Sequence, residues 1–255
     1  MKPIHRLTEP EQPLARLVCF PHAGGSASFF QPWKDIVPLD VELWAVQYPG
    51  RHDRLAEACP TSMSELIDDV LPTFDHAPRL PTVLFGHSLG AAVAYECARR
   101  LPHPPALVIL SARRGPGRAN EEPLGDMNDA DFLDGLARLG GLSTQILGNR
   151  QLLEIILPAL RADCRLSDAY SPDPDSPINA PILACVGDRD PSVTVDDILA
   201  WRSATVGAFS HQVYPGDHFY LQEHKAALVR AACDAAAPVQ LHRTPTPTPS
   251  SGRLQ

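Results

Sequence analysis

The sequence predicts an α/β domain with a mostly parallel central sheet and helices on both of its faces. Short apolar runs such as 16–20 and 82–85 alternate with longer segments in which apolar residues recur at helical spacing. Strands separated in this way by helices pair in parallel through crossover connections. A chain of 255 residues is long enough to bury the core of one such domain.

The expected elements follow one another in a regular order after residues 1–14, which are polar, rich in Pro and expected to form a surface lead-in. Ser26 is a good N-cap, so we expect a helix to begin there and to carry Phe29, Phe30 and Trp33. The strands are expected at 16–20, 41–46, 82–85, 106–110, 181–186 and 211–214. Further helices are expected around 61–74, 89–100, 131–139, 152–170, 198–201 and 226–237.

The alternation of strands and helices breaks between residues 113 and 177. This insertion contains no convincing strand but has two helical patterns. A long insertion at the carboxyl end of a sheet strand is usually functional, so we interpret it as a helical lid, with a packed helical decoration as the alternative. We assign residues 1–242 to the domain and expect the Pro- and Thr-rich tail, 243–255, to be disordered.

A serine between two glycines lies where a strand pattern meets a helix pattern. The sequence Gly86-His-Ser88-Leu-Gly90 follows an apolar run and precedes a helical one. Side chains at the two glycine positions would collide with neighbouring backbone, so glycine permits a sharp turn that exposes the serine hydroxyl. The helix N-terminus behind Ser88 would favour developing negative charge. We therefore predict that Ser88 is a nucleophile.

A serine nucleophile needs a base to accept its proton and a third group to orient that base. His218 follows the strand at 211–214, and Asp190 follows the strand at 181–186. Loops at the carboxyl ends of parallel strands meet at one edge of the sheet. The order Ser88, Asp190, His218 is that of the α/β hydrolases. Asp188 and Asp217 are the rival orienting acids.

An oxyanion hole needs two backbone N–H donors. One comes from the residue after the nucleophile, Leu89, and the other from a loop after an early strand. The Gly-rich loop Pro21-His-Ala23-Gly-Gly25 is that loop, and Ala23 is the expected donor. A turn that requires positive φ is the structural alternative for the glycines, and both interpretations can hold.

Composition excludes several other functions. The net charge of −8 argues against non-specific nucleic-acid binding. The six cysteines lack a C-x-x-C pair, which indicates reduced core residues in a cytoplasmic protein. The N-terminus has no secretory h-region and no apolar stretch is long enough to cross a membrane. No P-loop or zinc spacing occurs, so we expect no metal and no cofactor.

Several motifs in order carry a resemblance to a known family. They are Phe20-Pro-His-Ala-Gly-Gly-Ser26, Gln47-Tyr-Pro-Gly-Arg51, Gly86-His-Ser-Leu-Gly90, Ser111-Ala-Arg-Arg114, Gly187-x-x-Asp190-Pro and Gly216-Asp-His-Phe219. Over residues 14–236 the chain resembles type II thioesterases, the free-standing editing hydrolases of polyketide and nonribosomal peptide assembly lines. The resemblance implies the α/β-hydrolase fold, a mobile helical lid and hydrolysis of stalled acyl groups from the phosphopantetheine arm of acyl- or peptidyl-carrier proteins.

Three other functions are weighed against this one. A small-molecule carboxylesterase would share the triad, but the first loop reads Pro-His-Ala-Gly-Gly rather than His-Gly-Gly-Gly. A product-releasing thioesterase domain is expected to follow a carrier-like segment, and this chain starts at Met1 without one. A non-catalytic binding protein is expected to have lost Ser88, Asp190 or His218. We expect a free-standing, monomeric enzyme.

Two sets of residues are candidates for binding substrate and carrier. The arginines Arg113, Arg114 and Arg118 follow the strand at 106–110, so they belong to the same rim as Ser88 and could meet the carrier or the phosphopantetheine phosphate. Their alternative role is solvated surface or salt bridges to the lid. Apolar residues of the second lid helix, including Leu152, Ile155, Ile156 and Leu160, are expected to line the acyl chamber.

Overall fold

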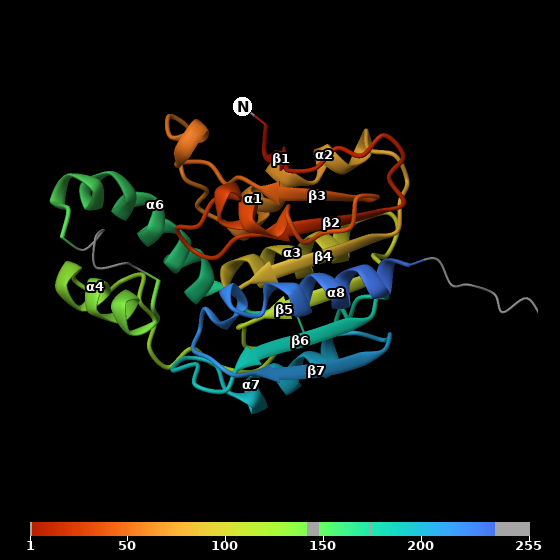
Figure 1. The fold of residues 1–255 in the computed structure, drawn as a ribbon. Coiled ribbons are helices and arrows are strands. Elements are labelled where there is room, and N and C mark those ends of the chain that lie inside the picture. The colour runs from red at the N-terminus through yellow and green to blue at the C-terminus, as the bar shows by residue number, and fades with distance from the viewer. Residues whose placement is uncertain (1, 142–147, 174, 238–255) are drawn as a thin grey trace, which may run out of the picture.

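The computed structural model describes residues 2–141, 148–173 and 175–237. In this part of the chain, seven strands form one sheet in the order β1-β3-β2-β4-β5-β6-β7 (Figure 1). All neighbouring strands are parallel except β1 and β3, so the predicted α/β fold with a mostly parallel sheet is confirmed. The strands are β1 (Ile4–Arg6), β2 (Ala15–Phe20), β3 (Val41–Val46), β4 (Thr82–His87), β5 (Leu107–Ser111), β6 (Ile182–Gly187) and β7 (Phe209–Tyr214).

The antiparallel edge strand β1 lies within the segment that we expected to be a surface lead-in. Ile4 pairs with Val46 and Arg6 with Trp44, and the Ile4 side chain is buried in the core. The expectation was wrong here because three residues are too few to show an alternating pattern. Pairing with the distant strand β3 determines this strand.

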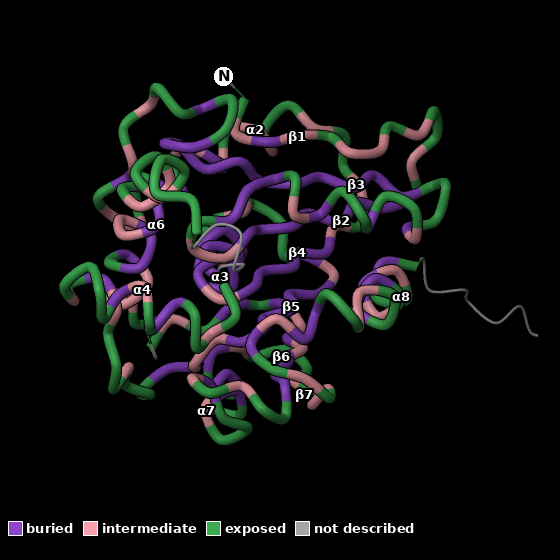
Figure 2. The backbone as a smooth tube through the Cα atoms, turned by 60° about the vertical axis from the view of Figure 1, so that its left-hand side comes forward, coloured by how far each residue is buried: buried purple, intermediate pink, exposed green. Residues whose placement is uncertain are grey.

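Helices cover both faces of the sheet, and Figure 2 shows the buried strands between them. Helices α1, α3 and α7 pack on one face, whose core includes Tyr95 and Trp201. The 3₁₀ helix η1 and helix α8 pack on the other, around Phe30 and Phe85. The bounds are η1 (Ala27–Trp33), η2 (His52–Arg54), α1 (Met63–Val70), α2 (Pro72–Asp75), α3 (Leu89–Arg100), α7 (Val195–Leu199), η3 (Ala200–Ala204), η4 (Tyr220–Gln222) and α8 (Lys225–Ala236).

The helix expected behind Ser26 forms, but as the 3₁₀ helix η1, and Ser26 does not cap it with its side chain. The Ser26 hydroxyl is hydrogen-bonded to the Ser28 hydroxyl at 2.8 Å instead. Pro32 inside the element cannot donate a helical hydrogen bond, which favours a short, tightly wound helix over a longer α-helix.

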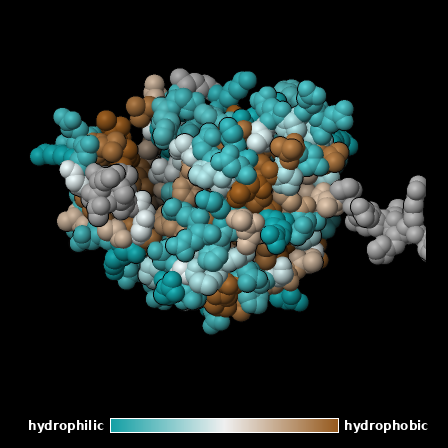
Figure 3. Space-filling model, in the orientation of Figure 1, coloured by the Kyte–Doolittle hydropathy of each residue, from teal (hydrophilic) through white to brown (hydrophobic). Residues whose placement is uncertain are grey.

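The insertion at residues 113–177 contributes helices α4 (Asp129–Arg138) and α6 (Arg150–Ala169), which lie beyond the carboxyl ends of the strands (Figure 1). They share a small core of Phe132, Leu136, Leu160 and Cys164. Hydrophobic side chains are exposed at the outer end of α6 (Figure 3), where Leu152 and Ile155 are 36% and 56% exposed.

Some of the sequence predictions fall on residues that the structure does not describe. Residues 142–147 and 174 of the insertion lie outside the described residues, and so does the tail expected to be disordered, 243–255. Among the described residues, no helix is long and apolar enough to cross a membrane. The same residues contain no cluster of three or more potential metal ligands.

Candidate active site

Ser88 occupies a sharp turn between β4 and α3. Its backbone has φ 56° and ψ −116°, a left-handed conformation that non-glycine residues rarely adopt. Its N–H donates to the Ser111 carbonyl of the neighbouring strand at 2.8 Å, which holds the turn against the sheet. The turn places Ser88 at the end of a buried strand and directly before the helix N-terminus.

The two glycines that flank Ser88 are required by close backbone contacts. A Cβ atom at Gly86 would collide with the carbonyl group of Gly90, and a Cβ atom at Gly90 would collide with the carbonyl group of Phe20. Backbone atoms cannot move aside as a flexible side chain can. The close contacts of this turn with its own backbone and with the end of β2 therefore need glycine at both positions.

His218 and Asp190 come together on the loops that follow β7 and β6. Their atoms Nδ1 and Oδ2 are 2.7 Å apart, and both side chains are almost completely buried. The other Asp190 oxygen, Oδ1, accepts hydrogen bonds from Ser192 N–H, Ser192 O–H and Val193 N–H. Burial raises the pKa of Asp190, but the hydrogen bonds from His218 and Ser192 outweigh that effect and hold the pKa below its ordinary value. Asp190 is therefore an ionised acceptor that fixes the imidazole.

The other two candidate acids, Asp188 and Asp217, form hydrogen bonds with groups other than His218. Asp188 Oδ1 accepts the Gly216 N–H at 2.8 Å, and its side chain is 47% exposed. Asp217 Oδ1 accepts the Phe219 N–H at 2.8 Å. Of the three carboxylates, only that of Asp190 is hydrogen-bonded to His218. Nδ1 is occupied by Asp190, which leaves Nε2 of His218 for a proton from the nucleophile.

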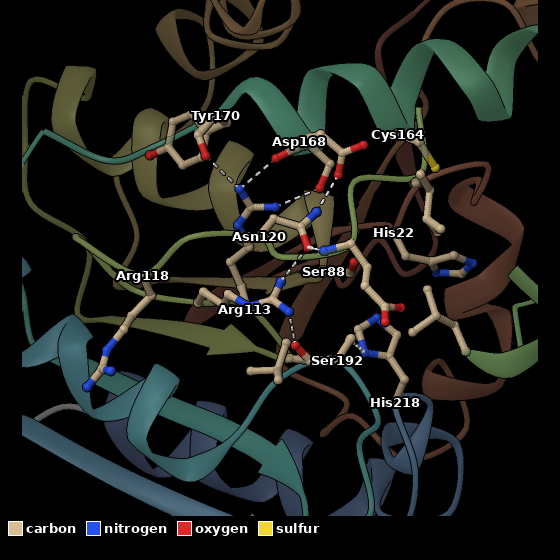
Figure 4. A pocket seen from close by; sticks show the side chains of 18 of the residues that line it. His22, Ser88, Arg113, Arg118, Asn120, Cys164, Asp168, Tyr170, Ser192 and His218 are labelled. Atoms are coloured by element: carbon tan, nitrogen blue, oxygen red, sulfur yellow. Dashed lines mark hydrogen bonds between the residues drawn. The ribbon is translucent and has the colours of Figure 1, made fainter. Parts of the chain in front are cut away.

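Ser88, Ala23 and His218 line one cavity of about 410 Å³, which lies between the ends of the strands and the insertion. Figure 4 shows His22 and His218 on one side of it and Arg118 on the other. No hydrogen bond joins Ser88 Oγ to His218 among the described residues. Such contacts are often long without substrate and shorten in the reacting complex.

Two backbone donors near Ser88 have no acceptor. The N–H groups of Ala23 and Leu89 donate to no other described residue, whereas that of Gly24 donates to Asp163. Leu89 is the first residue of α3, where N–H groups have no partner within the helix. Both donors are therefore available to an oxyanion.

His87 packs beside His218, with ring centroids 5.0 Å apart, and His22 packs beside His87, with ring centroids 6.0 Å apart. Burial lowers the pKa of His22 to about 3, and the positive charge of Arg51 contributes to the decrease. Burial also lowers the pKa of His87 well below its ordinary value. Both rings are therefore neutral at pH 7 and are poor bases.

The apolar candidates from α6 divide into two groups. Leu160 lines the cavity together with Leu136 and Cys164. Leu152, Ile155 and Ile156 are not among the described residues that line it. The structure does not bring these three to this cavity because they lie in the first two turns of α6, where the helix extends away from the sheet (Figure 1).

The three arginines after β5 have different surroundings. Arg113 donates to the Ser167 hydroxyl and to the Ser167 and Tyr170 carbonyls, and burial lowers its pKa to about 10. Arg113 therefore binds the C-terminal end of α6 through hydrogen bonds, and like Arg114 it also lines the cavity. Arg114 donates to the Ser192 carbonyl and to Asn120 Oδ1. Arg118 is exposed, lines the cavity, and its guanidinium has no hydrogen-bond or ion-pair partner among the described residues.

Sequence reasoning gave no role to Ser192, Arg51 or Asp163. Ser192 supports Asp190 from the same loop, and the turn residues around Asp190 could have suggested this. Arg51 and Asp163 form a buried ion pair beside the Ala23 loop. The available signal was an acidic residue among the apolar residues of α6, three positions after Leu160.

Comparisons with known proteins agree with this geometry. The family model described as "Thioesterase domain" matches residues 15–235. A "Probable cadicidin biosynthesis thioesterase" from Streptomyces griseus is 37% identical over 92% of this chain, and the match spans 66% of that relative. Thioesterase PikA5 from Streptomyces venezuelae is 40% identical over 82% of this chain and 76% of its own length.

A solved structure has the same fold. YbtT, a type II thioesterase from the yersiniabactin biosynthetic pathway, superposes with a TM-score of 0.83 at 30% identity, covering 92% of this chain and all of that one. Most of the sequence thus matches one family model, and the fold matches one of the family's solved members. The chain belongs to the thioesterase family, as a type II thioesterase with the α/β-hydrolase fold.

Proposed function

We propose that this enzyme hydrolyses stalled or aberrant acyl groups from the phosphopantetheine thiol of carrier proteins in polyketide or nonribosomal peptide biosynthesis. The observation that carries the proposal is the 2.7 Å contact between Asp190 and His218 beside the cavity that also exposes Ser88. The named pathways of the relatives support the substrate class. The six free cysteines favour the reducing cytoplasm.

In the proposed acylation step, Ser88 Oγ attacks the thioester carbonyl carbon and His218 Nε2 accepts the hydroxyl proton. Asp190 holds the imidazole in the required tautomer and stabilises the imidazolium. The Ala23 and Leu89 N–H groups donate to the oxyanion. The carbon–sulfur bond then breaks, and the departing thiolate takes the proton from His218, leaving an acyl ester on Ser88.

Deacylation uses the same groups with water in place of serine. His218 Nε2 accepts a proton from the water as its oxygen attacks the ester carbonyl. The second tetrahedral intermediate collapses, the bond to Ser88 Oγ breaks, and Oγ recovers its proton from His218. The free acid leaves. Helices α4 and α6 act as a lid that shields the acyl group, with Leu136 and Leu160 in the cavity wall.

Substitution of the three groups tests the catalytic assignment. Ser88→Ala and His218→Ala should each lower kcat by about 10⁶-fold. The nucleophile and its base act together, so removing either one abolishes nearly all of their joint contribution. Asp190→Asn should lower kcat by about 10⁴-fold, because the amide favours the wrong imidazole tautomer. Asp188→Asn is the matched control: its amide oxygen can still accept the Gly216 N–H, so kcat should barely change. If Asp188→Asn lowered kcat strongly and Asp190→Asn left kcat nearly normal, the assignment of Asp190 as the orienting acid would be refuted.

Arg118 is the proposed contact for the phosphopantetheine phosphate or an acidic carrier surface, because its guanidinium lines the cavity and has no partner in the described part of the chain. Arg118→Glu should raise KM for an acyl-carrier protein, most strongly at low salt, and leave KM for a small acyl thioester unchanged. The matched control is Arg189→Glu, an exposed arginine outside the cavity lining. Equal losses on both substrates would assign Arg118 to the active site or fold, and no loss on either would place docking elsewhere.

A further inference from the structure

A buried ion pair connects the body of the enzyme to the second insertion helix. Arg51 lies on the loop after β3, and Asp163 lies on α6. Arg51 Nη2 donates to Asp163 Oδ1 at 2.8 Å and Arg51 Nη1 donates to Asp163 Oδ2, a bidentate contact. The two side chains are 7% and 1% exposed. Two opposite charges are therefore held out of water at the base of the insertion.

The same pair holds the loop that carries the proposed oxyanion donor. Asp163 Oδ2 also accepts the Gly24 N–H at 2.8 Å, one residue beyond Ala23. Arg51 Nη1 donates to the Gly25 carbonyl at 3.4 Å. Gly24 itself has φ +72°, and a Cβ atom there would lie 2.5 Å from Leu160 Cδ1. The loop is therefore held by hydrogen bonds to both members of the pair and by close contact with Leu160 of α6.

Stability alone is a weak reason for such an arrangement. The cost of removing two charges from water often cancels their attraction, so a buried ion pair adds little over apolar residues of the same size. The placement of the pair beside the Gly-rich loop suggests a stronger reason, which is to hold that loop in place. The loop contains two consecutive glycines and needs external anchors to hold one conformation. An oxyanion donor has to lie within about 2.7–3.1 Å of the developing charge, so a small rotation of this loop removes its effect.

We propose that Asp163 and Arg51 are positioning residues that set the Ala23 N–H for the oxyanion. Because Asp163 belongs to α6, the oxyanion hole is complete only when the inner part of this helix is seated on the body. Displacement of α6 would disable the hole as well as uncover the acyl group. The inference rests on the proposed function and adds a link between lid position and catalysis.

The first test is Asp163→Asn, which keeps the side-chain volume, removes the charge that pairs with Arg51 and replaces one acceptor oxygen by an NH2 donor. Both Asp163 oxygens accept hydrogen bonds, so this NH2 group must face a donor of Arg51 or Gly24, unlike the amide in Asp188→Asn. We expect kcat for a short acyl thioester to fall about 10²–10³-fold, the effect of losing one oxyanion donor, with a small change in KM. Affinity for a trifluoromethyl ketone analogue, whose adduct with Ser88 carries an oxyanion, should fall by a similar factor. Thermal melting, followed by circular dichroism, reports separately on folding.

Glu42→Gln is the matched control. It breaks the buried pair between Glu42 and Arg16, which lie at the start of β3 and β2, away from the cavity. This variant should lose thermal stability and keep both kcat and analogue affinity. If Glu42→Gln lowered kcat as much as Asp163→Asn does, loss of any buried pair would explain the effect and the inference would fail.

The double variant Arg51→Met/Asp163→Leu separates positioning from folding, even if Asp163→Asn does not fold. It replaces both charges by apolar groups, which is often neutral or favourable for stability. We expect a folded protein with kcat still reduced at least 10²-fold. A double variant with normal kcat would overturn the inference. Activity in Ser88→Ala would instead contradict the proposed function, so the two failures are distinguishable.

Discussion

The two halves of α6 differ in burial and in the partners of their charged residues, although they form one continuous helix. In the outer half, residues 150–157, Leu152 and Ile155 are exposed and Arg150 pairs with Glu154 on the surface. In the inner half, residues 159–169, Leu160 and Cys164 are buried, and Asp163 is paired with Arg51. The inner half is thus packed against the body of the enzyme. The outer half presents apolar surface above it.

Pro158 lies between the two halves. Proline has no N–H to donate to the carbonyl four residues earlier and its ring crowds that carbonyl, so the helix is weakest there. The helix ends differ as well, since Arg113 binds the Ser167 and Tyr170 carbonyls at the inner end. The comparison shows that an amphipathic pattern identifies a helix but does not say which of its turns reach the site.

The largest expected difference between the halves comes from shortening one leucine or isoleucine in each. Leu160→Ala should lower the free energy of unfolding by about 2–5 kcal/mol, because it removes buried methyl groups and leaves a void. It should also enlarge the acyl cavity and shift the preferred acyl-chain length. Ile155→Ala should change stability by no more than about 0.5 kcal/mol and leave the preference unaltered.

Chemical denaturation and kcat/KM over thioesters of graded acyl length measure both effects. Similar destabilisation by the two variants would remove the distinction between inner and outer halves. A shift in chain-length preference for Ile155→Ala would show that the outer half reaches the acyl chain after all, as the sequence suggested.

The smallest expected effect concerns the ion pair of the outer half. Glu154→Gln breaks the contact between Arg150 Nε and Glu154 Oε1, which is 3.1 Å long between largely exposed side chains. Water and salt screen such pairs and the partners lose side-chain entropy, so the melting temperature should not change measurably. A clear decrease would mean that the outer half is held as firmly as the inner one.

The sequence predicted those parts of the molecule that depend on local patterns. Gly86 and Gly90 predict the sharp turn at Ser88, because backbone contacts at these two positions leave no room for a side chain. The strand ends predicted Asp190 as the orienting acid, with Asp188 and Asp217 as rivals. The hydrogen bonds that separate Asp190 from Asp188 depend on the three-dimensional arrangement of the loops and are not visible in the sequence.

The features that sequence reasoning missed depend on contacts between distant residues. The strand β1 is defined by its partner β3, about 40 residues away along the chain. Arg51 and Asp163 are separated by 112 residues, and nothing in either local sequence indicates that they meet. The same applies to Leu152 and Ile155, whose exposure depends on where α6 leaves the body.

The wall of the acyl cavity contains the thiol of Cys164. Burial raises the pKa of this thiol well above its ordinary value, and the carboxylates of Asp168 and Asp163 raise it further. Exchange between a thiol and a thioester requires the thiolate, which is scarce here at neutral pH. The Cys164 thiol therefore stays in its protonated, weakly nucleophilic form in the wall of this cavity.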